Sequence, residues 1–198
     1  MSGMLVTYTG RVLPADPLAI QSVDISINDL EAHLGRIVRW NGATRAPISV
    51  ARHSVAVARI LREMCQGPGV QLAGLLHDGH ESYLNDVISP IKQQLQADYC
   101  AWAAHLDRQI LTALGLAELL PLLGGAQVVC ADRAALYQEA HLLRDPARGE
   151  LLKDLAARWG YRPLAFAGCY RNQPSWGVVY AQLRREYGRR RTEHDDRG

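Results

Sequence analysis

The sequence predicts a single domain with an all-α fold. Apolar residues recur at helical spacing from residue 28 almost to the C-terminus, and Gly, Pro or Asn separate the helical segments. Strand patterns are nearly confined to the first 27 residues, and the segment 161–170 is a weaker later candidate. Because strands and helices do not alternate along the chain, a helical bundle with a short extended N-terminal segment is favoured over an α/β fold.

The predicted elements follow from the apolar spacing and from the residues that interrupt it. Residues 5–27 are expected to be extended, because Gly10, Pro14 and Pro17 break any longer pattern. Seven helices are expected after this segment, over residues 28–40, 48–65, 72–84, 91–114, 127–143, 150–159 and 175–187. Pro90 can open the fourth of them.

The composition indicates one globular unit. The chain has 198 residues, of which 48% are hydrophobic and 21% are charged, and this balance excludes a disordered or collagen-like chain. A chain of this length can bury a substantial core. We expect one domain over residues 1–198, with its core at about 28–145 and a flexible tail over 189–198.

Charge and cysteine content exclude several classes of protein. The 22 Lys and Arg against 20 Asp and Glu give a net charge of +2, so a stable nucleic-acid partner is not expected. The four cysteines form no CxxC pair, which argues against a zinc ribbon and for reduced thiols. The N-terminus carries no signal-peptide pattern, and no run of about 18 apolar residues occurs. We therefore expect a cytoplasmic protein with no membrane partner.

Familiar catalytic motifs are incomplete in this chain. His80-Glu81 begins the HExxH motif of zinc proteases, but Leu84 stands where the second His is required. Ser89 to Lys92 matches SxxK, yet no SDN or KTG motif follows. Neither a P-loop nor a GxSxG motif is present. These absences argue against a zinc-protease site, a penicillin-binding site, a P-loop nucleotide site and a serine-esterase site.

One constellation of polar residues remains. His77 and Asp78 follow the apolar stretch 72–76 directly. On a continuous helix Glu81 would project about 40° from His77, between His77 and Asp78. Such a sector of three polar groups could ligate a metal, although His-Asp is also ordinary at a solvated helix end.

Two residues elsewhere strengthen the metal interpretation. His53 lies inside the apolar segment 48–65, where a lone His is more often a satisfied core residue. Asp132 lies inside an apolar stretch, and a buried carboxylate is costly unless it is paired or ligating. Two His and two Asp from three helices would form a mixed nitrogen and oxygen site for a divalent metal.

The order His53, His77-Asp78, Asp132 resembles the H…HD…D signature of the HD-domain metal-dependent phosphohydrolase superfamily. The chain is similar in particular to small bacterial 5'-deoxynucleotidases and to compact phage dATP triphosphohydrolases, over about residues 5–145. The resemblance implies an HD-type helical bundle and a divalent transition metal (Mn, Co, Zn, Fe or Ni), with additional Mg on the substrate phosphates. It also implies a homo-oligomer, a dimer or a hexamer.

The resemblance further assigns roles around the metal. It implies that Glu81 assists catalysis and that Asp86 contacts the substrate. It implies that Arg39 binds phosphate and that Trp40 faces the nucleoside. Lys92 would offset phosphate charge and Pro90 would form an apolar wall. Gly42 is small where some dATP-selective relatives carry a bulkier residue, which predicts tolerance for more than one purine. Taken singly, Trp40, Asp86 and Lys92 also suit structural roles.

The function expected from these residues is divalent-metal-dependent hydrolysis of (2'-deoxy)nucleoside phosphates. A dNTP triphosphohydrolase acting on a dATP-like purine is the first candidate, and a 5'-deoxynucleoside monophosphatase is the alternative. A non-enzymatic metal- or nucleotide-binding regulator is the alternative of another class, and Glu81 favours the enzyme. The sequence leaves open the phosphate chain length, the base, the native metal and the roles of His80 and the Arg-rich tail.

Overall fold

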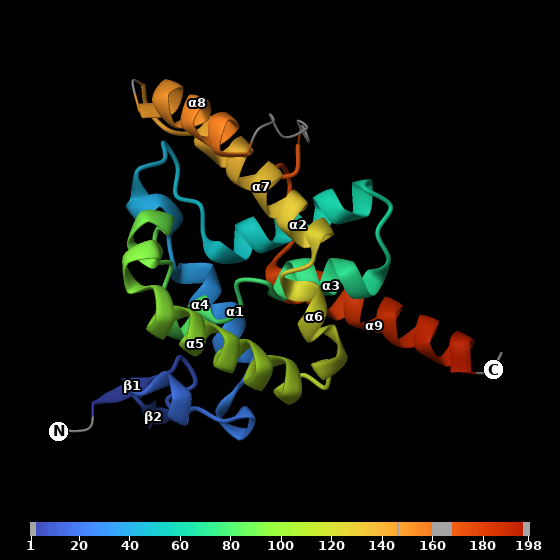
Figure 1. The fold of residues 1–198 in the computed structure, drawn as a ribbon. Helices are drawn as coiled ribbons and strands as arrows, with labels where there is room; N and C mark the ends of the chain where they lie inside the picture. Colours follow the sequence, from blue (N-terminus) through green and yellow to red (C-terminus); the bar gives the residue numbers. More distant parts are fainter. Residues whose placement is uncertain (1–2, 146, 160–167, 196–198) are drawn as a thin grey trace.

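The computed structural model describes residues 3–145, 147–159 and 168–195, and this part of the chain is mainly helical (Figure 1). The all-α prediction is confirmed. The expected extended segment contains a small antiparallel hairpin of β1 (Met4–Val6) and β2 (Val12–Pro14), in which Leu5 pairs with Leu13. Two short 3-10 helices follow it, η1 (Pro17–Ala19) and η2 (Ser22–Asp24). Most of the strand candidate 161–170 lies outside the described residues.

The remaining elements succeed one another with short connections. They are α1 (Ile27–Arg36), η3 (Arg39–Gly42), α2 (Val50–Glu63), α3 (Pro68–Leu76), α4 (Glu81–Leu84), α5 (Ser89–Ala113), η4 (Ala117–Leu119), α6 (Leu120–Leu123), α7 (Ala126–Ala140), α8 (Ala147–Trp159) and α9 (Trp176–Asp195). Five of the seven expected helices correspond to α2, α5, α7, α8 and α9, with ends that differ by a few residues except at the C-terminus of α9.

The centre of the bundle is the packing of α2 against α3 and α7. The side chains of Val57, Ile60 and Leu61 on α2 are fully buried. A Cβ atom at Gly74 on α3 would collide with Leu61, so glycine at this position lets the two helices approach closely. This tight contact fixes the C-terminal end of α3 relative to the C-terminal half of α2.

The first helix ends earlier than expected. The spacing predicted a helix over 28–40, but α1 ends at Arg36 and the chain then forms a bridge between Val38 and Ser49. Trp40 and Asn41 follow with positive φ angles of 59° and 48°. The apolar periodicity continues through this turn because Ile37 and Trp40 pack by tertiary contact, which a local pattern does not distinguish from helix.

The helix expected over 72–84 is broken. Helix α3 ends at Leu76 and α4 begins at Glu81, with a turn between them in which Gly79 N donates to Leu76 O at 2.8 Å. A Cβ atom at Gly79 would lie 2.9 Å from Leu76 O, so the turn requires a glycine. The helical-wheel placement of Glu81 between His77 and Asp78 is therefore wrong, because the three residues do not share one helix.

The C-terminal region is more ordered than expected. Helix α9 continues to Asp195 instead of ending near 187, so the segment expected as a tail from 189 is helical through Asp195. Trp176 and Leu183 of α9 are buried in the same cluster as Leu34 and Val50. Leu13 and Ile20 contribute to another cluster, with Leu106 of α5. The core thus extends beyond the expected range of 28–145 at both ends.

Within the described ranges, no single helix combines the length and apolar character needed to cross a membrane. The stretch Ala117–Leu123 together with α7 meets these criteria only as a pair, and the two parts are bent by 58°. The second half of that pair is α7, which carries the buried Ala131, Ala134 and Ala135 against α2.

Candidate metal centre and its pocket

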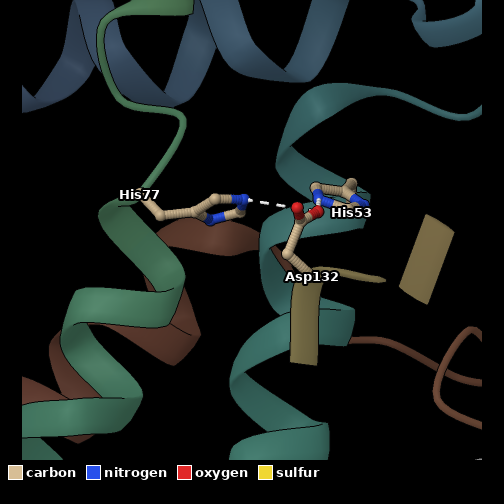
Figure 2. Close-up of side chains that lie close together, drawn as sticks. All are labelled: His53, His77 and Asp132. Carbon is tan, nitrogen blue, oxygen red and sulfur yellow. Dashed lines mark ion pairs between the residues drawn. The ribbon is translucent and has the colours of Figure 1, made fainter. Parts of the chain in front are cut away.

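The four predicted metal ligands come together at the end of α3. His53 lies in the first turn of α2, His77 and Asp78 lie at the turn after α3, and Asp132 lies on α7. His53 Nε2 is 3.0 Å from Asp132 Oδ1, and His77 Nε2 is 3.8 Å from the same oxygen. Figure 2 shows the side chains of His53, His77 and Asp132 pointing toward one another. Asp78 Oδ2 lies 3.2 Å from His77 Nε2 and 3.7 Å from His53 Nε2.

Both imidazoles are oriented by their Nδ1 atoms. His77 Nδ1 lies 2.8 Å from Gly74 O, and a carbonyl only accepts, so Nδ1 carries the proton. His53 Nδ1 lies 2.7 Å from Glu139 Oε1. Each Nε2 atom is therefore the one that can bind either a proton or a metal ion, and both are buried without a hydrogen-bond partner among the described residues. Two buried, unpartnered imidazole nitrogens beside two carboxylates fit a divalent cation.

The charges at this point also suit a cation. Burial opposes protonation of His77, but Asp78 and Asp132 outweigh it and place the pKa of His77 well above its usual range. Burial likewise opposes ionisation of Asp132, yet His53 and His77 hold the pKa of Asp132 well below its usual range. The carboxylate of Asp132 therefore stays ionised and attracts a positive charge, as a proton on the imidazoles or as a metal ion.

Glu139 organises the site, and the sequence analysis missed it. Its side chain is fully buried and receives hydrogen bonds from Arg39 Nε at 3.1 Å and Trp40 Nε1 at 2.8 Å. Tyr170 Oη also donates to it. Burial would raise the pKa of Glu139, but Arg39 and His53 outweigh burial and lower it to about 2.

A sequence signal for Glu139 existed. Glu139 follows Asp132 by seven residues, and two helical turns place residues at this spacing on one face. Because Asp132 was already a candidate ligand, a second acid on the same face of α7 could have been linked to it. The contact from Tyr170 carried no comparable signal, since it comes from a distant segment.

Arg39 and Trp40 lie beside the centre, as the resemblance implied. Arg39 is only 8% exposed, and its Nη1 is 3.3 Å from Asp78 Oδ2. Burial opposes its charge, but Glu139 and Asp78 raise the pKa of Arg39 above its usual range, so it stays cationic. The left-handed turn at Trp40 lets both side chains reach Glu139 from adjacent positions.

Glu81 is buried and paired with Lys92. Its side chain is 1% exposed, and Lys92 Nζ donates to Glu81 Oε1 at 2.7 Å. Burial and the neighbouring Asp78 raise the pKa of Glu81 to about 7, although Lys92 acts in the opposite direction. A carboxylate with a pKa near neutrality can both take up and release a proton at physiological pH.

A pocket of about 340 Å³ opens in front of this cluster. Its lining combines the charged groups of the centre with an apolar wall, and consists of Arg39, Trp40, Asn41, Asp78, Glu81, Asp86, Val87, Ile88, Lys92, Asp132, Leu136, Leu151, Leu155 and Arg158. Three of these, Leu151, Leu155 and Arg158, come from α8 and were not foreseen. In the sequence these residues form an ordinary amphipathic helical pattern, which does not distinguish a pocket wall from any other packed helix.

For two of the residues expected to contact substrate, Gly42 and Pro90, the structure does not show a place in the pocket lining. Gly42 is not part of the described lining, where its neighbour Asn41 stands instead, and Gly42 has a φ of 74° with open space around it. Its expected role beside the base is therefore not supported by its position. Pro90 lies in the first turn of α5, and its side chain lies outside the described part.

Comparison with known proteins agrees with this geometry. The family model described as HD domain matches residues 50–137, a range that contains all four clustered residues. The chain belongs to the HD-domain family. HD domains bind divalent metals and are generally metal-dependent hydrolases, and His53, His77 and Asp132 form a cluster that could hold such an ion.

Two relatives are similar over the greater part of the chain. An uncharacterized protein of Rhodobacter capsulatus is 33% identical over 136 residues, which cover 67% of this chain and 68% of the relative. The uncharacterized protein YfdR of Escherichia coli K12 is 29% identical over 114 residues, which cover 58% of this chain and 60% of YfdR. Neither name states a substrate.

Proposed function

We propose that this HD-domain protein hydrolyses (2'-deoxy)nucleoside phosphates with a divalent transition metal, Mn, Co, Zn, Fe or Ni. One observation carries the proposal above the others. The unpartnered Nε2 atoms of His53 and His77 meet two carboxylates at the inner end of a pocket whose lining also offers three cations and an aromatic ring. A bound metal would supply Lewis-acid polarisation of a phosphoryl oxygen and a lower pKa for water.

The residues around the pocket would hold the metal, accept a proton and bind phosphate. His53, His77, Asp78 and Asp132 would hold the ion. Glu81 would accept one proton of the water that attacks phosphorus. The bond from phosphorus to the nucleoside 5' oxygen breaks as the new bond to the water oxygen forms, and the 5' oxygen takes its proton from solvent. Lys92 holds Glu81 in place at 2.7 Å before substrate binds, and can then turn its ammonium to a phosphate oxygen.

Phosphate and nucleoside would occupy different sides of the pocket. Arg39 is fixed by Glu139 and Asp78, which orients its guanidinium toward the phosphate next to the metal cluster. Trp40 and the leucines at 136, 151 and 155 offer an apolar surface for base and sugar. A ring packed against the sugar leaves little space for a 2'-hydroxyl, so deoxyribose is favoured. Asp86 would accept a hydrogen bond from a hydroxyl group of the sugar.

The first candidate substrate is a purine dNTP similar to dATP, cleaved to nucleoside and tripolyphosphate with additional Mg on the phosphates. This candidate rests on the similarity of the segments 39–42 and 75–92 to small HD nucleotide phosphohydrolases, a group that includes compact phage dATP triphosphohydrolases and bacterial 5'-deoxynucleotidases. Because Gly42 does not line the pocket, the base would be selected by Trp40, Asn41 and the wall from α8.

A specific observation favours a second candidate, a 5'-deoxynucleoside monophosphatase. The volume of about 340 Å³ lies near the lower end of the usual range for ligand pockets. Four carboxylates and three cations are among the described lining residues, so one divalent ion brings the lining to about one net positive charge. This balance suits a phosphate dianion better than a triphosphate.

Product analysis tests the proposal and separates the two candidates. Protein loaded with Mn²⁺ is incubated with a panel of NTPs, dNTPs, NMPs and dNMPs, and the released phosphate species are identified. Tripolyphosphate from dNTPs supports the first candidate, and inorganic phosphate from dNMPs supports the second. Asp132→Ala should release neither, while Cys130→Ala, at an exposed position two residues away on α7, should match the parent.

Absence of turnover for every nucleotide would overturn the enzymatic proposal. If the metal-loaded protein then still binds a nucleotide in calorimetry, the non-enzymatic regulator is the correct class. The same resemblance leads us to propose a cytoplasmic homo-oligomer, a dimer or a hexamer, and light scattering of the purified protein decides the oligomeric state.

A further inference from the structure

The buried carboxylate of Glu139 accepts two hydrogen bonds on each of its oxygens. Oε1 accepts from His53 Nδ1 at 2.7 Å and from the hydroxyl of Tyr170. Oε2 accepts from Arg39 Nε at 3.1 Å and from Trp40 Nε1 at 2.8 Å. A carboxylate has about four lone-pair positions, so these donors fill them. Because Glu139 is fully buried, water does not replace a donor that is removed.

Tyr170 differs from the other three donors in its place in the chain and in the site. Arg39 and Trp40 line the pocket, and His53 belongs to the metal cluster. Tyr170 is not in the described lining, and it lies after the range 50–137 that the HD-domain model matches. Its hydroxyl lies 3.5 Å from His53 Nδ1, so both groups share one oxygen of Glu139. Tyr170 thus contacts the carboxylate that orients a metal ligand, and not the pocket itself.

The turn that carries Tyr170 is fastened to α2 by two arginines. Arg52 Nη2 donates to the carbonyl oxygen of Tyr170 at 3.3 Å. Arg59 donates to the carbonyl oxygens of residues 169, 171 and 172, at 3.4, 2.7 and 3.1 Å. Cys169 is buried in a cluster with residues of α2 and α7. These contacts hold the hydroxyl of Tyr170 at a defined position beside His53.

We propose that Tyr170 is a positioning residue of the metal centre. Its hydroxyl holds the carboxylate of Glu139 so that Oε1 fixes the ring of His53 while Oε2 fixes Arg39. Without the hydroxyl, one lone pair of a buried carboxylate lacks a partner, and the carboxylate is free to rotate away from the imidazole. Contacts behind a metal ligand orient it and set its basicity.

The segment 168–173 therefore belongs to the metal centre, although it lies beyond the matched HD-domain range. The inference rests on the proposed function only in that it assumes a metal ion bound to His53. It does not depend on which nucleotide enters the pocket, or on whether one is hydrolysed.

Binding of Co²⁺ tests this role without measuring activity. The metal-free full chain is titrated with Co²⁺ in a calorimeter, and the d–d absorption bands of the loaded protein report the geometry of the ligands. Tyr170→Phe keeps the ring and removes the hydroxyl. It should weaken Co²⁺ binding by about 10-fold and shift the bands. This value is at the lower end of the usual range because Tyr170 acts one contact further from the metal than Glu139.

Tyr137→Phe is the matched control. Tyr137 is another partly buried tyrosine, on α7, and its ring is in edge contact with His141. Its variant should bind Co²⁺ with the affinity and the absorption bands of the parent. An equal loss of affinity in the two variants would overturn the proposal, because the effect would then not depend on the hydroxyl that contacts Glu139.

A double variant shows whether Tyr170 acts through Glu139. Groups in one hydrogen-bond network have coupled effects, whereas independent groups have additive free energies. Tyr170→Phe combined with Glu139→Gln should therefore weaken Co²⁺ binding by clearly less than the product of the two single losses. Losses that multiply would overturn the role through Glu139.

Arg59 provides a second route to the same test if Tyr170→Phe folds poorly. Arg59→Met removes the donor that fastens the turn but keeps an unbranched apolar side chain. It should weaken Co²⁺ binding in the parent and have no further effect in Tyr170→Phe. Arg62→Met, at an exposed arginine on the same helix, is the control and should match the parent. Circular dichroism checks the helical content of each variant.

The outcomes distinguish this inference from the proposed function. Equal Co²⁺ affinity and equal absorption bands in the parent and in Tyr170→Phe overturn the role of Tyr170 and leave the proposed function intact. A parent chain that binds no Co²⁺ overturns the metal centre on which both rest. Weaker binding in Tyr170→Phe and Arg59→Met, with both controls unchanged, supports the inference.

Discussion

The two sides of the pocket are built differently. The inner side consists of α2, the end of α3 and α7, where His53 and Glu139 are fully buried and are joined by a 2.7 Å contact. The outer side consists of η3 and α8, and α8 is attached mainly through Leu155 in a small cluster with Ala140 and Leu143. The inner side can therefore hold ligands in one geometry, while the outer side can adjust to a substrate. Removal of inner residues should abolish activity, and changes in the outer wall should shift affinity.

The largest effect is expected for the inner ligand Asp132. Asp132→Ala should lose the tightly bound ion and at least about 10³-fold in turnover, since the metal provides the main stabilisation of the transition state. Elemental analysis of the purified variant measures the loss of metal. Metal content equal to that of the parent would contradict the assignment of Asp132 as a ligand. It would also contradict the view that the inner side of the pocket holds the metal in one geometry.

A variant at Glu81 should lower catalytic turnover without removing the metal ion. Glu81→Ala should keep the ion held by the two histidines and still bind nucleotide, yet lower kcat by about 10²–10⁴-fold, because its carboxylate handles the proton of water. Single-turnover kinetics and metal analysis on one sample provide both values. A kcat within a few-fold of the parent would make Glu81 a structural partner of Lys92.

A variant at Glu139 tests whether metal binding on the inner side depends on this buried carboxylate. Glu139→Gln keeps the shape of the side chain but weakens its contacts with His53 and Arg39, so metal affinity should fall by about 10–100-fold. Calorimetric titration of the metal-free variant measures this change. Gln138→Ala, at the preceding position on α7, is the control and should bind metal as the parent does. Unchanged affinity in Glu139→Gln would show that His53 is oriented without this carboxylate.

The outer wall should give a smaller effect at Arg158. Arg158 is paired with Asp154 on the same helix and is partly exposed, so Arg158→Ala should raise KM by about 2–5-fold with little change in kcat. Arg148→Ala removes another cation of α8, one that is paired with Asp145 and is not in the described lining. Equal KM values for the two variants would remove Arg158 from the substrate site.

The smallest functional effect is expected at Gly42. From the sequence alone, the small Gly42 predicted tolerance for more than one purine, so a bulkier residue there would narrow the range. The structure leads to another expectation, because Gly42 has a φ of 74° and does not line the described pocket. Gly42→Ile should lower the free energy of unfolding by about 1–2 kcal/mol and leave base preference unchanged. Denaturant unfolding and kcat/KM for dATP and dGTP test both parts.

The order of His53, His77-Asp78 and Asp132 was sufficient to predict a divalent-metal site, because each residue interrupts an apolar segment where an unpaired polar group would be costly. The helical class also followed from local spacing, since amphipathic periodicity is a property of consecutive residues. The same local logic failed at Leu76, where a turn that needs Gly79 replaces the expected continuous helix.

Only the tertiary structure decided which groups support and surround that site. Glu139 reaches His53 and Arg39 across α2, α7 and η3, and Tyr170 reaches Glu139 from beyond α8. The apolar wall of α8 and the pairing of His80 with Asp107 likewise join residues far apart in the chain. Such contacts depend on how helices pack, and packing is determined by the shape and volume of many side chains together, which a pattern along the sequence does not contain.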